Sequence, residues 1–314
     1  MTYNVLGAQA DGNVFSEHAG MAARIDQVQP DVVVLQEVQS DDVVALLTQT
    51  TTPYRLASYL KWECDVKSDQ EGVAILVRSA ISVTTAGRRH VGSTCANPTV
   101  KRVLVWADLD LPGGPLRVYG THLTAGSGDS TSSRNAQIRQ IRAVIEADDP
   151  DGRGRWLFTG DMNTTPGASG YRLITVGEPG ADAIRMVDTF AEVSPAALDP
   201  TTCPTIASSD AAGLAGLLAN PAAVRACGYT AGWPKDDNFL GCDVLSLCNS
   251  WQLRRDQPVR ERIDNVFRAV DGPVTVLDTF VPNRSDADWA SPGSEWFRLS
   301  DHLPYVADLA IAAD

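Results

Sequence analysis

Six residues near the middle of the chain decide the predicted fold, and their sequence is Phe158-Thr159-Gly160-Asp161-Met162-Asn163. They continue an apolar run that begins at Trp156. This pattern is typical of a buried strand that presents a carboxylate and an amide at its C-terminal end, on one face because side chains alternate along a strand. Such a pair can hold a phosphate oxygen, a metal-bound water or a nucleophile. The following segment, Thr164–Gly167, resembles a turn and helix cap, so the stretch alone leaves loop structure and catalysis both open.

Four other segments place a polar side chain at the end of an apolar run or inside it. Val32–Glu37 ends in a carboxylate, and Val118–His122 ends in an imidazole. Arg262–Phe267 contains one acidic residue, Asp264, and the pair Asp301-His302 precedes the last apolar run of the chain. Each block is short and weakly specific, but their order along the chain is a much stronger signal.

In this order the blocks resemble the endonuclease/exonuclease/phosphatase superfamily, the DNase I-like phosphoesterases, and within it DNase I and the sphingomyelinase/phospholipase C enzymes. The resemblance runs from Thr2-Tyr3-Asn4-Val5 to Asp301-His302 and covers nearly the whole chain. It implies an α/β fold, a four-layer α/β/β/α sandwich in which two mixed β-sheets pack face to face with helices outside and the site at one sheet edge. It also implies a single domain over residues 1–314, with a cysteine-containing insertion at about 195–256.

Local patterns divide the chain into helices and strands. Helical spacing predicts helices over residues 17–28, 40–47 and 134–147, with Ser40 as the cap of the second. Strand patterns cover residues 3–6, 32–37, 72–77, 81–85, 102–109 and 116–120, and a turn at 112–115 joins the last two. Between about 195 and 256 the pattern breaks down, which indicates an insertion pinned by disulfides.

The composition limits the partners that the protein can have. The chain has 314 residues, 44% of them hydrophobic, which is enough for one large core. Its net charge of −13 argues against binding a polyanion through bulk electrostatics, although local basic patches and metal ions can override net charge. No apolar run approaches the roughly 18 residues of a membrane-spanning helix, so we expect at most a peripheral contact with a membrane surface. We also expect a monomer.

The six cysteines indicate an exported protein. They are even in number, and the sequence has neither a C-x-x-C motif nor a Cys/His pairing suited to zinc. Disulfides in a secreted protein therefore explain them better than buried thiols do. The pairing that keeps each bridge local is Cys64–Cys95, Cys203–Cys227 and Cys242–Cys248.

The candidate metal ligands are oxygen donors. Water attacks phosphodiesters slowly because the ester is anionic and the leaving oxygen departs as an alkoxide, and a divalent metal relieves both problems. Mg²⁺ prefers hard oxygen ligands, so we expect Mg²⁺ here, with Mn²⁺ or Ca²⁺ as alternatives. Glu37 is the first candidate, since a surface Glu would not explain why a wholly apolar run ends there. The resemblance implies that Asp301 is a second ligand, and Asn4 is a further candidate at the metal. Asn4 and Asn163 would also orient the carboxylate, the metal-bound water or the phosphate.

His302 is the candidate general base. An imidazole near its ordinary pKa of about 6.5 takes a proton from water at neutral pH. It needs a partner on its other nitrogen, and the resemblance gives that role to Asp264, which lies in an otherwise apolar strand where an unpaired carboxylate is costly. The alternative is a structural Asp264 bonded only to the backbone. Asp161 completes the predicted catalytic carboxylates.

His122, Glu71 and Arg102 are assigned to the substrate phosphate and its surroundings. The resemblance implies that His122 holds a phosphoryl oxygen or assists the leaving group, because DNase I and the sphingomyelinases also have His at this position. Glu71 opens a strand that ends in Arg78, as in the DNase pattern, and would orient His122. Arg102 stands at the head of its strand and would lie near the site, or else would extend along the sheet edge with its charge in water.

Two departures from the nuclease pattern bear on the substrate. The nucleases carry Arg two residues after the metal-binding Glu and Tyr two residues before the strand-opening Glu, and here these positions hold Gln39 and Asp69. Both changes remove DNA contacts. Aromatic residues near the site and in the insertion suit a lipid interface, or else serve as core and loop anchors. They are Trp233, Phe239, Trp251, Trp289, Trp296 and Phe297.

The sequence therefore predicts a secreted, Mg²⁺-dependent phosphodiester hydrolase that cleaves phospholipid or sphingolipid head groups, as phospholipases C and sphingomyelinases do. A DNase I-like endonuclease acting on nucleic acid is the alternative. It is supported by Glu71 and His122 and opposed by Gln39, Asp69 and the net charge. An inositol-phosphate phosphatase ranks third, because no basic cluster for several phosphates is evident.

Overall fold

The fold comes from a computed structural model of the chain. It describes residues 1–5, 14–63, 71–92, 101–126, 128–178, 184–199, 201–203, 206–207, 226–228, 258–259, 262–280, 302 and 304–312. Of residues 14–17, 206–207 and 258–259 the backbone alone is described.

The first sheet is built mainly from the N-terminal part of the chain, in the strand order β1-β2-β4-β3. Its strands are β1 (Thr2–Asn4), β2 (Val32–Val38), β4 (Gly72–Arg78) and β3 (Tyr54–Lys61). β1 pairs with β2 in parallel, and the other pairs are antiparallel. β13 (Val274–Phe280) and β14 (Val306–Ile311) pair antiparallel as a separate two-stranded sheet. Just before β14, Tyr305 forms an isolated bridge to β1, in which Thr2 and Tyr305 exchange backbone hydrogen bonds of 2.8 and 2.9 Å. The N-terminal and C-terminal parts of the chain therefore meet at this bridge.

The second sheet has the strand order β5-β6-β7-β8-β12-β9. β7 and β8 are parallel, and the other neighbours are antiparallel. The strands are β5 (Ser82–Val91), β6 (Arg102–Leu111), β7 (Gly114–His122), β8 (Trp156–Asp161), β12 (Asp264–Ala269) and β9 (Met186–Asp188).

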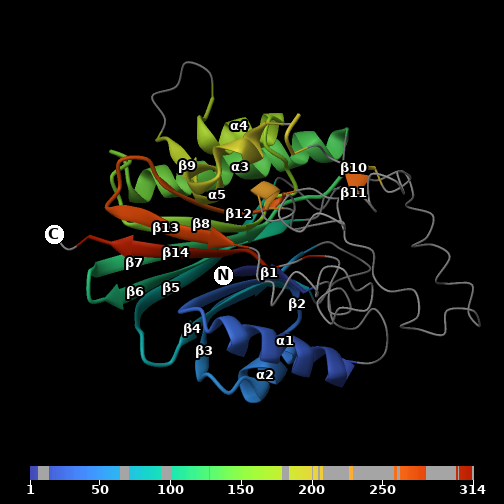
Figure 1. Cartoon of the computed structure of the whole chain (residues 1–314), viewed down its shortest axis with the longest axis vertical. Coiled ribbons are helices and arrows are strands. Elements are labelled where there is room, and N and C mark those ends of the chain that lie inside the picture. The colour runs from blue at the N-terminus through green and yellow to red at the C-terminus, as the bar shows by residue number, and fades with distance from the viewer. Residues whose placement is uncertain are drawn as a thin grey trace, which may run out of the picture.

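Helices cover the outer faces of both sheets (Figure 1). α1 (Val14–Val28) and α2 (Ser40–Gln49) pack on the first sheet, whereas α3 (Asp129–Asp148) and α4 (Ser169–Thr175) pack on the second. The short helix α5 (Thr189–Val193) follows β9. Two mixed sheets face each other between these helices, so the predicted four-layer α/β/β/α sandwich is confirmed. None of the helices in the described ranges is long and apolar enough to span a bilayer.

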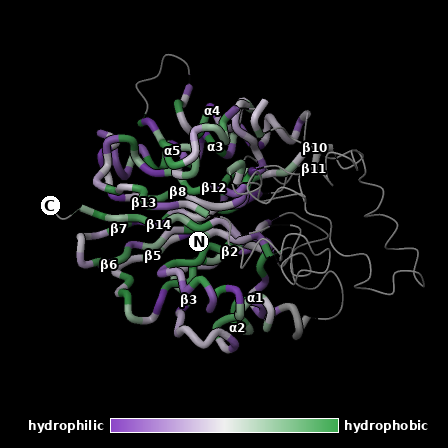
Figure 2. Tube along the Cα trace, in the orientation of Figure 1, coloured by the Kyte–Doolittle hydropathy of each residue, from purple (hydrophilic) through white to green (hydrophobic). Residues whose placement is uncertain are grey.

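Strand β2 is buried on both of its faces, one against the helices and one against the second sheet. Val33 and Leu35 are buried against α1 and α2, while Val34 between them packs in the core that lies between the two sheets. A strand that buries both faces needs apolar residues at every position, because its side chains alternate between the two faces. Hydrophobic positions accordingly run along the strands at the centre of the molecule in Figure 2.

Several elements differ from their predictions. β3 is not predicted, because it is an edge strand in which only Tyr54 and Ser58 are buried and the apolar alternation is weak. β5 continues to Val91, beyond the predicted end at 85. The cap of α2 is Gln39, not Ser40, since the Asp42 carboxylate accepts a hydrogen bond from the Gln39 backbone N–H.

Most of the predicted insertion at 195–256 lies outside the described residues. Its described parts include a 3₁₀ turn at Pro195–Leu198 and strand β10 (Ile206–Ala207), which pairs with β11 (Pro258–Val259). Cys203 and Cys227 form a disulfide, and this is one of the three pairs that local pairing predicts. The cysteines of the other two pairs, at 64, 95, 242 and 248, lie outside the described residues.

Strand register brings three predicted site residues into one row. His122 at the end of β7 lies opposite Asp161 at the end of β8, and Asp161 lies opposite Asp264 at the start of β12. Gly160 permits the close approach of β7 and β8. Its φ is 138°, and a Cβ atom there would lie 1.9 Å from the Thr121 carbonyl oxygen. The second sheet thus holds an imidazole and two carboxylates side by side at one edge.

We predict that Gly160→Ala destabilises the fold more than Gly167→Ala does. Both glycines have a positive φ that side chains rarely adopt, so each Ala suffers backbone strain of about 1–3 kcal/mol. Only at position 160 would the new Cβ also collide with backbone, since nothing lies within 4 Å of it at position 167. Unfolding in urea measures both losses. Equal losses in the two variants would contradict the close approach of β7 and β8.

Candidate active site

Glu37 reaches the site from a bulge in β2, and the strand does not end there as the sequence predicts. The register of β2 against β4 shifts between Gln36 and Val38, so Glu37 is an extra residue on the bulged strand. Its φ is 55°, which is uncommon for a residue with a side chain. Because a bulge takes a side chain out of the strand's alternation, the Glu37 carboxylate is aimed at the ends of β1 and β7.

Asn4 joins two carboxylates. The Nδ2 atom of Asn4 lies 3.0 Å from Glu37 Oε1 and 3.0 Å from Asp161 Oδ2, and Asn4 is fully buried. An amide nitrogen has two hydrogens, so one goes to each carboxylate. The atom that faces the site is therefore a donor that cannot bind a cation. These contacts give Asn4 the orienting role that the sequence predicts, and ligation by its oxygen stays a prediction.

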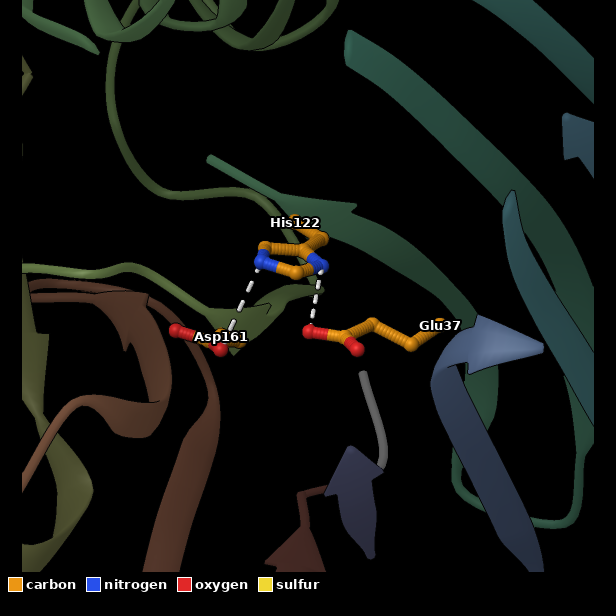
Figure 3. Close-up of side chains that lie close together, drawn as sticks. All are labelled: Glu37, His122 and Asp161. Carbon is orange, nitrogen blue, oxygen red and sulfur yellow. Dashed lines mark ion pairs between the residues drawn. The ribbon is translucent and has the colours of Figure 1, made fainter. Parts of the chain in front are cut away.

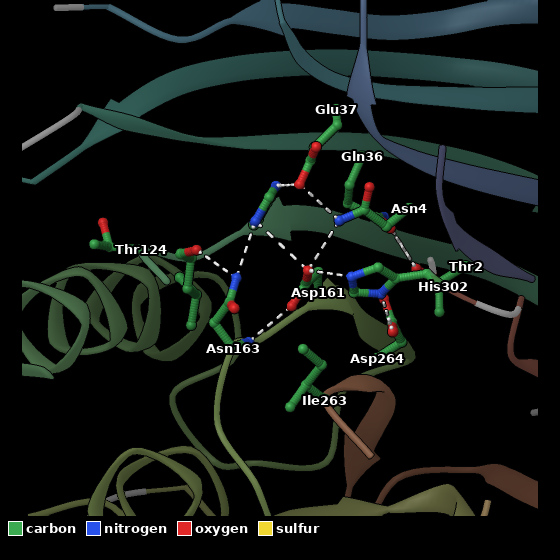
Figure 4. Close-up of polar contacts among 12 residues, drawn as sticks. Thr2, Asn4, Gln36, Glu37, Thr124, Asp161, Asn163, Ile263, Asp264 and His302 are labelled. Atoms are coloured by element: carbon green, nitrogen blue, oxygen red, sulfur yellow. Dashed lines mark hydrogen bonds and ion pairs between the residues drawn. The ribbon is translucent and has the colours of Figure 1, made fainter. Parts of the chain in front are cut away.

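Asp161 lies at the centre of the site (Figure 4). Its Oδ1 accepts a hydrogen bond from the Asn163 backbone at 2.9 Å, while its Oδ2 lies 3.5 Å from His122 Nε2 and 3.8 Å from His302 Nε2. Burial, together with the negative charge of Asp264, raises the pKa of Asp161 from 3.8 to about 7. A carboxyl group with that pKa is partly protonated at neutral pH in the metal-free protein.

Asn163 orients His122, and it does so from a turn. β8 ends at Asp161, and Asn163 follows it with a φ of 47°, so the strand alternation predicted for these two residues is wrong although both reach the site. Asn163 Nδ2 donates to the Leu123 carbonyl oxygen at 2.9 Å, and this acceptor identifies the nitrogen end of the amide. The same nitrogen lies 2.9 Å from His122 Nε2. That ring nitrogen must therefore accept, and the proton of neutral His122 is on Nδ1.

His122 is held neutral between two carboxylates (Figure 3). Burial, with the positive charge of Arg102 next, lowers its pKa well below 6.5. Its Nδ1 lies 3.9 Å from Glu37 Oε1 and has no hydrogen-bond partner within the described part of the chain. His122 Nδ1 is therefore a buried N–H donor beside the Glu37 carboxylate. It is a weak source of a full proton.

His302 and Asp264 form the predicted pair. His302 Nδ1 lies 2.8 Å from Asp264 Oδ2, and both residues are buried. Because a carboxylate accepts, Nδ1 carries the proton in the neutral ring and Nε2 presents a lone pair. That lone pair faces Asp161 Oδ2 across 3.8 Å. The geometry is that of a base oriented by a buried acid.

Trp62 is a site residue that the sequence reasoning missed. Its ring centroid lies 5.2 Å from that of His122, and the guanidinium carbon of Arg102 lies 3.9 Å from its ring centroid. Arg102 is only 8% exposed, so it stacks on Trp62 and does not extend into water, which decides between the two predicted placements. Trp62 directly follows the unrecognised strand β3, and recognition of that strand would have found it.

The remaining predicted residues are placed less completely. The Glu71 backbone oxygen accepts a hydrogen bond from the Trp62 backbone N–H at 2.8 Å, so Glu71 lies beside Trp62. Its predicted contact with His122 stays a prediction. The predicted second ligand Asp301 lies outside the described residues, as do Asp69 and the six aromatic residues named for a lipid interface.

The donor set fits a hard divalent cation. Ligand atoms of Glu37, His122 and Asp161 lie within 4.8 Å of one another, and so do those of Asp161, Asp264 and His302. In the group of Asp161, Asp264 and His302, the last two already form a hydrogen bond with each other, which makes them less suited to bind a metal. In the first group His122 Nε2 accepts from Asn163, which leaves carboxylate oxygens as the donors. Mg²⁺, Mn²⁺ and Ca²⁺ all accept such ligands.

Comparisons with known proteins agree with this geometry. A profile of the Endonuclease/Exonuclease/phosphatase family matches residues 1–302. No curated protein sequence matches the chain. Among solved structures, the human nocturnin catalytic domain with bound sulfate has a TM-score of 0.62 at 14% identity, over 98% of this chain and 91% of that one. An endonuclease/exonuclease/phosphatase from Bacteroides vulgatus has a TM-score of 0.60 at 17% identity, over 99% and 97%. TDP2 from D. rerio, complexed with a single-strand DNA product, has a TM-score of 0.56 at 16% identity, over 98% and 97%.

The chain belongs to the endonuclease/exonuclease/phosphatase family, as the ordered sequence blocks predict. Members of this family are metal-dependent hydrolases of phosphoester bonds, and this chain is an enzyme of that kind. The family includes both nucleases and phosphatases, so membership leaves the substrate class open.

We predict that Asp161 makes the metal-free protein less stable as pH rises. Its pKa is higher in the folded state than the ordinary 3.8, so between that value and about 7 the folded protein binds more protons than the unfolded chain. Stability then falls with rising pH across this window. In EDTA, Asp161→Asn should remove that part of the fall in Tm.

Asp26→Asn is the matched control, because hydrogen bonds from Thr51 and Thr52 lower the pKa of Asp26 and its contribution lies at lower pH. It should leave the slope between 3.8 and about 7 unchanged. An unaltered slope in Asp161→Asn would contradict the assignment.

Proposed function

We propose that the protein is a Mg²⁺-dependent phosphodiester hydrolase in which Glu37 binds the metal and His302 is the general base. The position of Asp161 supports this most strongly. One buried carboxylate lies between the Asn4–Glu37 contact on one side and the His302–Asp264 pair on the other. A phosphate at Asp161 would therefore meet the metal ligand and the base from opposite sides.

The chain's own groups divide the work on the substrate. A water within hydrogen-bond distance of both His302 Nε2 and Asp161 Oδ2 would lose its proton to His302 as its oxygen attacks phosphorus. The P–O bond to the leaving group would break, and the departing alkoxide would take a proton from solvent water. The Asp264 carboxylate would stabilise the imidazolium that forms. His122 would donate a hydrogen bond from Nδ1 to a phosphoryl oxygen. When bound, Mg²⁺ would offset the negative charge that develops on the phosphoryl oxygens.

A phospholipid or sphingolipid head group is the substrate that we favour. Gln39, where the nucleases carry a DNA-contacting Arg, is the N-cap of α2 in a capping box with Asp42, so it is committed to the helix. The net charge of −13 also opposes a polyanionic duplex. Contact with a lipid surface would be peripheral.

A nuclease is the second candidate. His122 suits nucleases as well as sphingomyelinases, and TDP2, whose fold this chain shares, was solved with a single-strand DNA product. The cluster around Asp161 would cleave a nucleic-acid phosphodiester by the same steps. The two candidates therefore differ in the surface around the site and agree in its centre.

We predict that Asp264 and His302 act as a unit. His302→Ala should lower the rate on the order of 10²–10⁴-fold, the range for loss of a general base. Asp264→Asn should cause a large part of the same loss, because the ring would lose the acceptor that fixes its orientation. The double variant should lose little more than His302→Ala alone. Losses that multiply in full would show that the residues act independently.

We predict that the enzyme hydrolyses phospholipid and fails on DNA. The assay compares sphingomyelin, phosphatidylcholine, phosphatidylethanolamine and phosphatidylinositol micelles with plasmid DNA at matched enzyme and Mg²⁺. Every turnover should stop in EDTA, since all candidates need the metal. Efficient plasmid nicking that weakens steeply with salt, with no release from any lipid, would reverse the ranking and favour the nuclease. Full turnover in EDTA would remove the metal from the proposal.

A further inference from the structure

A buried His–Asp pair lies between α1 and α2, outside the site described above. His18 Nε2 lies 2.8 Å from Asp42 Oδ1, and the exposed fractions of the two residues are 3% and 2%. They lie where the two helices bury apolar side chains such as Met21 and Val43. An apolar pair would be less costly to bury there. The proposed chemistry uses neither residue, so the pair needs another account.

The second oxygen of Asp42 holds the backbone that leaves β2. Asp42 Oδ2 accepts from the Gln39 backbone N–H at 2.7 Å, and Gln39 O accepts from Val43 N at 3.1 Å. Gln39 is the N-cap of α2, in a capping box with Asp42. Both oxygens of Asp42 are thus engaged, one by helix α1 and the other by the residue that starts α2.

Only Val38 separates this anchored residue from the Glu37 bulge. Val38 is fully buried and returns to the ladder opposite Gly72. A left-handed residue with a side chain costs on the order of 1–3 kcal/mol and persists only where its surroundings fix it. On the upstream side, Gln36 is fixed by its ladder partner and by hydrogen bonds with the Thr2 side chain. On the downstream side, the anchor is Gln39, held by Asp42.

We propose that His18 is a positioning residue for the metal centre: by bonding Asp42 it fixes the start of α2 and so the bulge from which Glu37 reaches the site. The proposal rests on Glu37 as a metal ligand. Without His18, the buried Asp42 carboxylate loses its partner and is no longer fixed on Gln39. Glu37 then loses its single orientation. Metal affinity falls, while the rate at saturating metal changes little because the His302–Asp264 pair is untouched.

The test compares two amides that differ in reach. His18→Gln can place an amide nitrogen near the position of Nε2 and keep a donor to Asp42, whereas the shorter His18→Asn cannot. Calorimetric titration of the metal-free protein with Mn²⁺ measures affinity directly, and the metal concentration for half-maximal activity gives a second value. His18→Asn should bind metal about tenfold more weakly, within the range for outer-shell partners. His18→Gln should stay close to the unchanged protein.

Val43→Ala is the control for general destabilisation. Its side chain is buried in the same cluster but takes no part in the hydrogen bonds to Asp42, so it should lower Tm and leave the metal affinity unchanged. Gln39→Pro breaks the hydrogen bond between Asp42 and the Gln39 backbone without changing His18. It removes the N–H that donates a hydrogen bond to Asp42, and it should weaken metal binding even if His18→Asn does not fold.

Three outcomes would overturn the proposal. Unchanged metal affinity in both His18→Asn and Gln39→Pro would do so, as would an equal loss in Val43→Ala, because the effect would then be general. A Glu37→Gln variant separates a failure of the ligand assignment from a failure of the positioning role. If it too leaves metal affinity unchanged, the ligand assignment fails and the positioning role fails with it. If it weakens binding while the His18 and Gln39 variants do not, only the positioning role is wrong.

Discussion

Two carboxylates on neighbouring strands, Asp161 and Asp264, lie opposite each other and are each 1% exposed. Buried like charges repel in a medium that screens them poorly, so such a pair survives only with donors around it. Those donors come from distant parts of the chain: Asn4 from the first strand, Asn163 from the turn after β8, and His302 from near the C-terminus. The site is therefore complete only when both ends of the chain are in place, and the exchange of hydrogen bonds between β1 and Tyr305 joins those ends.

Backbone strain is concentrated where these donors and acceptors must be aimed. Among the described residues, the non-glycine positions with positive φ are Gln29, Glu37 and Asn163, and two of them belong to the site. Glycine would relieve the strain but would remove the carboxylate or the amide that the strain serves to place. The surroundings therefore have to fix these conformations. Asp161 fixes the conformation of Asn163 by accepting a hydrogen bond from its backbone N–H. The pairing of β2 with β4 and the capped start of α2 fix the conformation of Glu37.

The sequence predicts the parts of this arrangement that depend on burial alone. The sequence reveals β2 and β8 because strands buried on both faces read as apolar runs, and Glu37 and Asp161, near the ends of those runs, are residues that reach the site. β3 is invisible because an edge strand has no such run, and Trp62 is missed with it. The bulge at Glu37 leaves no trace in periodicity, since one residue's φ does not alter the pattern of apolar positions. The hydrogen bonds of Asn163 depend on Leu123 and His122, which only the fold brings near.

Two imidazoles flank one carboxylate in this site, and their partners give them opposite roles. An amide donor on His122 Nε2 places the ring proton on Nδ1, and burial keeps the ring neutral, so His122 can donate a hydrogen bond but is a poor proton source. A carboxylate acceptor on His302 Nδ1 leaves Nε2 as a lone pair and stabilises the cation that forms when Nε2 takes a proton. Neither role depends on which alcohol is esterified to the phosphate. Under the proposed function, the centre of the site is therefore equally suited to lipid and nucleic-acid phosphodiesters, and residues around it, such as the helix cap Gln39, would discriminate between them.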